Sequence, residues 1–156
     1  MNWGGSEILL LLLAAALVTA AVGDLRSRTI EHWLVIGIAL GAIPFWWLTG
    51  LELWPDVATR IGVAALVFAA FAGLFAIGWM GGGDVKLLGA LALWLPPNAV
   101  LFLLIAMSLG GGVLTLAMSI RHRVCKNGTQ IEIPYGVAIA FGGLWLIGER
   151  FLNQFG

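Results

Sequence analysis

The chain has 156 residues, of which 61% are hydrophobic and only 10% are charged. A soluble domain carries about 25% charged residues, so this composition excludes an ordinary soluble fold and indicates a polytopic membrane protein. Eight acidic residues balance eight Lys and Arg residues, so no net positive field favours binding to nucleic acid. We expect one domain over residues 1–156, and the single Cys125 excludes an internal disulfide.

The apolar segments predict helices, taken here from the N-terminus. Segment 1–23 lacks the basic region of a signal peptide, so we expect a retained first helix. The uncharged interval 87–120 would be roughly 51 Å long as one helix, too long for a hydrocarbon core of about 30 Å. Pro96 and Pro97 break it. The sequence therefore predicts an all-α fold of six transmembrane helices with a short fourth one, near residues 7–23, 32–49, 57–79, 85–95, 99–119 and 134–150.

The basic residues predict the orientation of these helices. One side of a six-span topology holds Arg26, Arg28, Lys86, Arg121, Arg123 and Lys126, whereas the other holds Arg60 and Arg150. Loops on the cytoplasmic side of a membrane carry an excess of Lys and Arg. We therefore expect the loops 24–31, 80–86 and 120–133 in the cytoplasm and both termini in the periplasm.

Two aspartates stand out, and this topology places both on the cytoplasmic side. Asp24 closes the first predicted helix, and Asp84 opens the short fourth one after three consecutive glycines. Counted back from Pro96, Asp84 lies roughly 18 Å along a helix, which leaves it on the order of 10 Å inside the cytoplasmic leaflet. An ionisable residue at that depth faces a partner or a wet cavity. Both aspartates are therefore candidate functional residues.

Spacing alone leaves two interpretations of these acids open. In the structural one, Asp84 caps a helix beside an anchoring Lys86, and Asp24 pairs with Arg26 or Arg28. In the functional one, the two carboxylates meet, share one proton and titrate as a unit. One carboxylate would then act as a general base on water, while its protonated partner polarises the carbonyl that is attacked.

Three motifs resemble those of the type IV prepilin peptidases, which are GxGD aspartic peptidases. Their GxGDxKLL motif matches GGGDVKLLGAL, their first-aspartate motif is similar to GDLRSRTIEHWL, and their late Pro-aromatic-Gly segment is similar to IPYGVAIAFGGL. The resemblance implies that Asp24 and Asp84 are the catalytic pair and that Gly81 and Gly83 are the motif glycines. It also implies that Lys86 positions the site.

The same resemblance assigns the late segment and exposes one departure. Pro134, Tyr135 and Gly136 match the family segment that helps to shape the substrate groove. Glu31 and His32 stand where the family usually has Pro-Asn. Glu31 can still support the start of the second helix through the helix dipole, and His32 is interpreted as an interfacial residue. Because of this difference at Glu31 and His32, the geometry of the loop before the second helix and the substrate preference could differ from those of the family.

The function implied by the resemblance is that of a multi-pass aspartic endopeptidase of the bacterial inner membrane. Its substrates would be prepilins or pseudopilins with a single hydrophobic helix, which lose their N-terminal leader at the cytoplasmic face. The chain resembles the small subgroup that serves tight-adherence, or Flp-type, pili. The short first cytoplasmic loop and the lone Cys125 indicate no N-methyltransferase activity. No metal or cofactor is implied, and lipid is the other expected partner.

Two further functions stay open on the sequence. One is a non-catalytic assembly factor of a pilus or secretion machine, which the Glu31-His32 departure allows. The other is a small transporter in which buried aspartates relay protons or ions. The transporter is less favoured because, apart from Ser and Thr, the predicted helices are almost purely apolar.

Overall fold

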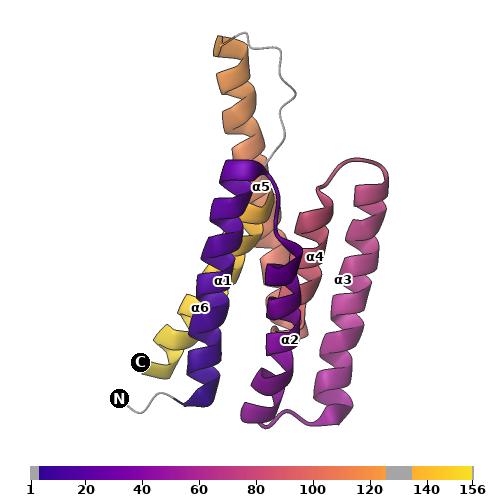
Figure 1. The fold of residues 1–156 in the computed structure, drawn as a ribbon, viewed down its shortest axis with the longest axis vertical. Helices are drawn as coiled ribbons and strands as arrows, with labels where there is room; N and C mark the ends of the chain where they lie inside the picture. Colours follow the sequence, from indigo (N-terminus) through magenta and orange to yellow (C-terminus); the bar gives the residue numbers. More distant parts are fainter. Residues whose placement is uncertain (1–3, 126–134, 156) are drawn as a thin grey trace.

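The computed structural model of the protein describes residues 4–125 and 135–155. Over these residues the chain is all-helical, with six α-helices and no strand (Figure 1). The helices are α1 (Gly5–Ser27), α2 (His32–Leu48), α3 (Ala58–Ala76), α4 (Gly82–Ala92), α5 (Pro97–Cys125) and α6 (Tyr135–Phe155), and a π-helical turn, η1 (Leu53–Val57), precedes α3. The predicted all-α fold is confirmed.

Three helices, α1, α5 and α6, are longer than the sequence predicted, and α6 runs to Phe155 rather than to residue 150. The first was expected to end near residue 23, but α1 continues to Ser27 and takes Asp24 into its last turn. It ends where Arg28 adopts a left-handed conformation with φ 53° and donates its backbone N–H to Asp24 O. Likewise, α5 continues to Cys125. The predicted ends were placed at charged side chains, which mark the membrane boundary. A helix itself ends at a capping conformation or at a proline, which lacks a backbone N–H.

Three helical segments among the described residues are long and apolar enough to cross a membrane: Gly5–Ser27, Leu53–Ala76 and Tyr135–Leu152. Two shorter apolar helices cover His32–Leu48 and Pro97–Val113. The short fourth helix has 11 residues, or roughly 17 Å, about half of a hydrocarbon core. Six crossings and the orientation of the termini therefore stay predictions.

The helices run side by side, so their ends gather at two ends of the bundle (Figure 1). The start of α1, the end of α6 and the α2–α3 connection lie at one end, and the α1–α2 and α3–α4 connections lie at the other. Helix α6 packs against α1, α4 and α5, whereas α3 packs mainly on α4 and barely contacts α5. The bundle is therefore closed around α4 and α6 and open between α3 and α5.

Helix α4 is enclosed by the other helices. Leu87, Leu88 and Leu91 have no exposed surface. The end of α4 is also held by hydrogen bonds, since the Trp94 indole N–H donates to Ile38 O at 2.8 Å. The Arg60 guanidinium donates to Trp94 O at 2.5 Å. These bonds satisfy polar groups that an apolar environment would otherwise leave unpaired, so α4 is a fixed support for the residues at its start.

Candidate active site

Asp84 lies in the first turn of α4 and is only 7% exposed. The N-cap of this helix is Gly81, so Asp84 lies three residues inside the helix and is not its N-cap residue, as the structural interpretation would have it. The Asp84 carboxylate turns back toward Gly81, so that its Oδ2 lies close to the start of the helix. An acid at the third helical position does the same in a capping box. This contact fixes the direction in which the carboxylate points.

The glycines before Asp84 permit close packing at this helix start. A side-chain carbon built on Gly81 would lie 2.9 Å from Asp84 Oδ2. One built on Gly83 would lie 3.2 Å from Cβ of Ile30, a buried residue of the α1–α2 connection. The two motif glycines therefore bring α4 against its neighbours and leave room for the Asp84 carboxylate.

Asp24 approaches from α1 and is only 5% exposed. Its Oδ2 accepts a hydrogen bond of 3.2 Å from the backbone N–H of Val137, in the first turn of α6. The N-terminal N–H groups of a helix have no partner inside the helix, and the helix dipole favours a carboxylate there. Of the two arginines expected as partners, Arg28 acts on Asp24 through its charge.

The two carboxylates converge at Gly136. A side-chain carbon built on this glycine would lie 2.7 Å from Asp24 Oδ2 and 3.0 Å from Asp84 Oδ1. The structure thus brings together Asp24, Asp84 and Gly136 from α1, α4 and α6. We call this arrangement the aspartate pair.

Such a pair is suited to general acid–base chemistry. Two carboxylates facing one small space share a proton, so that one accepts a proton while the other donates one. Among the described residues, no three His, Cys, Asp or Glu side chains are grouped as metal ligands would be. Two facing acids can accept and donate protons, and that is the chemistry this arrangement supports.

The other residues singled out in the sequence lie around this pair or away from it. Lys86 is exposed on α4, and Tyr135 is half-buried at the start of α6. Pro134 lies outside the described residues.

Glu31 is the N-cap of α2, but its carboxylate accepts a hydrogen bond from the Trp33 indole N–H rather than capping the helix. His32 is exposed, and α2 begins there without the Pro-Asn of the family.

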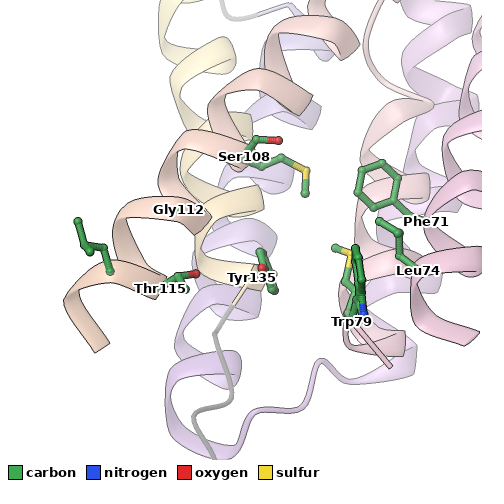
Figure 2. A pocket seen from close by; sticks show the side chains of 10 residues that line it. Phe71, Leu74, Trp79, Ser108, Gly112, Thr115 and Tyr135 are labelled. Atoms are coloured by element: carbon green, nitrogen blue, oxygen red, sulfur yellow. The ribbon is translucent and has the colours of Figure 1, made fainter. Parts of the chain in front are cut away.

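A groove lies beside the aspartate pair, and of its lining residues only Tyr135 was singled out from the sequence. The groove has a volume of about 780 Å³ and is shown in Figure 2. Its walls are Phe71, Leu74, Trp79, Met80, Met107, Ser108, Gly112, Thr115, Leu116 and Tyr135. A further signal in the sequence, not used above, is the series of small residues Ser108, Gly112 and Thr115, whose spacing places them on one face of α5. We call this feature the α3–α5 groove.

A comparison with known proteins identifies the family. The sequence model of the type IV leader peptidase family matches residues 11–116, a segment that contains both aspartates and all of α4. Comparisons with curated protein sequences and with solved structures returned no match. The family match covers more than half of the chain and agrees with its apolar helices. The protein therefore belongs to the type IV leader peptidase family, whose members are membrane-embedded peptidases.

Proposed function

We propose that the protein is an aspartic endopeptidase that removes the N-terminal leader from prepilins or pseudopilins. Asp24 and Asp84 are its catalytic residues. The observation that carries this proposal is the convergence of both buried carboxylates on Gly136. A helix cap or a surface ion pair would not require two acids from different helices to face the same point.

The reaction follows from the shared proton of the aspartate pair. The ionised carboxylate takes a proton from a water molecule, whose oxygen attacks the carbonyl carbon of the scissile peptide bond. The protonated carboxyl group donates its proton to the carbonyl oxygen, which gives a neutral tetrahedral diol. When the diol collapses, the C–N bond breaks, the carboxyl group that took the water proton gives it to the leaving nitrogen, and the other carboxylate takes a proton from a diol hydroxyl. The two products are a carboxylic acid and an amine.

The first turn of α6 positions one partner of the pair. The Val137 N–H holds Asp24 Oδ2 on the side that faces Gly136. Gly136 has no side chain, so the two carboxylates can approach its backbone without being pushed apart. In this proposal Gly136 and Val137 are positioning residues, and Gly81 has the same role for Asp84.

The location of the pair supports cleavage at the cytoplasmic face of the bacterial inner membrane. Asp24 and Asp84 lie at the end of the bundle that holds the α1–α2 and α3–α4 connections (Figure 1). The positive-inside rule assigns that end to the cytoplasm. The α1–α2 connection, residues 28–31, is too short to hold a methyltransferase domain. This favours the peptidase-only subgroup that serves Flp-type pili.

Leader removal in cells tests this proposal. The protein is co-expressed with a candidate prepilin as wild type, as Asp24→Asn and as Asp84→Asn, and the loss of the leader is followed by mass spectrometry. We expect each variant to lose at least about a thousandfold in rate, because neither can complete the proton transfers. Asp56→Asn, an exposed acid in η1, is the matched control and should process normally. Processing that persists in both catalytic variants contradicts the proposal and favours an assembly factor.

A further inference from the structure

We propose that the α3–α5 groove holds the hydrophobic helix of the substrate, with Ser108, Gly112 and Thr115 of α5 as the wall in closest contact. This inference rests on the proposed function and names a specificity site for it. The groove lies between two helices that barely contact each other. Figure 2 shows α5 on one side, Phe71, Leu74 and Trp79 on the other, and Tyr135 between them.

The length of the groove suits a helix. Its wall on α5 extends from Met107 to Leu116, which is on the order of 14 Å, or two to three helical turns. Ser108 and Gly112 are exposed along this wall. Small residues let two helix backbones approach closely in a membrane, where packing replaces the hydrophobic effect as the driving force. The α5 wall thus offers a contact surface for a second helix.

The chemistry of the walls requires an apolar occupant. The Ser108 hydroxyl donates to Leu104 O at 2.7 Å, and the Thr115 hydroxyl donates to Gly111 O at 2.6 Å. Both hydroxyl protons are therefore already used within α5. The opposite wall consists of aromatic and aliphatic side chains, including Phe71 and Trp79. An apolar helix, whose backbone polar groups are internally satisfied, fits such walls better than a polar segment does.

The groove is continuous with the aspartate pair at two points. Tyr135 lines the groove, and the next residue, Gly136, contacts both carboxylates. Met80 also lines it, and the next residue, Gly81, contacts Asp84. A helix in the groove would therefore end beside the two acids. The non-helical chain that precedes it would carry its peptide bonds to them, so the groove sets where the cut falls relative to the helix.

Filling the groove tests this inference. Outside its own stretch of α5, no described atom lies within 4 Å of a side-chain carbon built on Gly112, which lines the groove, so Gly112→Leu adds its side chain on the groove side. We expect leader removal to slow by about tenfold or more, mainly through a higher KM. Gly62→Leu is the matched control, since this α3 glycine has equally open surroundings and is outside the groove. It should process at the wild-type rate.

A photo-cross-linking residue gives a second measurement. It is placed at Ser108 in the inactive Asp84→Asn variant, and at Leu66 as a control that is 70% exposed on α3 outside the groove. We expect a cross-link to the prepilin helix from position 108 and none from position 66. A cross-link from 108 only to lipid or to a second copy of the protein overturns the inference.

The two proposals fail in different ways. Wild-type leader removal that Gly112→Leu leaves at full rate overturns the groove assignment and leaves the aspartate pair standing. If the wild-type protein removes no leader, the proposed function fails, and the cross-link from Ser108 then decides the groove by itself.

Discussion

Gly136 and Gly112 belong to neighbouring parts of the same site, but a side chain would meet opposite surroundings at them. At Gly136 it would press on both carboxylates, and at Gly112 it would meet no described atom within 4 Å. The crowded region is built from α1, α4 and α6, and the open one lies between α3 and α5. The crowded region and the open region meet different requirements of the proposed peptidase. The first holds the two acids in fixed positions, and the second leaves space for a substrate.

Among substitutions outside the two aspartates themselves, the largest effect is expected from adding a methyl group on the crowded side. Gly136→Ala places a carbon 2.7 Å from Asp24 Oδ2 and 3.0 Å from Asp84 Oδ1. The carboxylates must move apart, and a misplacement of about 1 Å costs roughly a hundredfold in rate. The rate of leader removal by purified enzyme measures this. Gly148→Ala, in the same helix with no described atom within 4 Å, should be unaffected. Full activity of Gly136→Ala would contradict the crowded site.

A smaller effect is expected at the start of α4. Gly81→Ala places its methyl carbon 2.9 Å from Asp84 Oδ2 and touches only one of the two acids. Its φ of −71° suits alanine, so the backbone is not strained. We expect about a tenfold loss in kcat with little change in KM, because the groove is not altered. Steady-state kinetics check this, and a change confined to KM would show that Gly81 contacts substrate instead.

The smallest effect on activity is expected where α4 ends. Trp94→Phe removes the indole N–H that donates to Ile38 O. We expect the free energy of unfolding to fall by on the order of 1 to 3 kcal/mol, while the activity of the folded fraction stays normal. Denaturation in mixed micelles measures the free energy, with the exposed Trp47→Phe as control. A loss of activity at unchanged stability would link this distant end to the aspartate pair.

Much of the crowded side could be predicted from the sequence. The charges, the double proline and the apolar intervals predict six helices, a short fourth one and two aspartates near the same end. The residues that bring the acids together could not be derived in this way. Gly136 was assigned to a groove by resemblance, but the structure places it against the carboxylates and puts Tyr135 in the groove. That distinction depends on how α6 packs against α1.

The open region between α3 and α5 could not be predicted because no hydrophobic periodicity in the sequence distinguishes it. In a membrane, helix faces that contact protein and faces that contact lipid are equally apolar, so periodicity does not separate them. Ser108, Gly112 and Thr115 mark a face on which a helix can pack, but the sequence does not say whether that helix belongs to the protein. The structure shows that α3 does not fill this place.

The position of Val137 and Gly136 at the start of α6 has a consequence for synthesis of the protein. A growing chain that has inserted α1 to α5 already holds both acids, but it lacks the backbone that orients Asp24 and separates the two carboxylates. Under the proposed function, the incomplete chain lacks a working centre until α6 is in place. Cleavage of a substrate would then begin only when the bundle is complete.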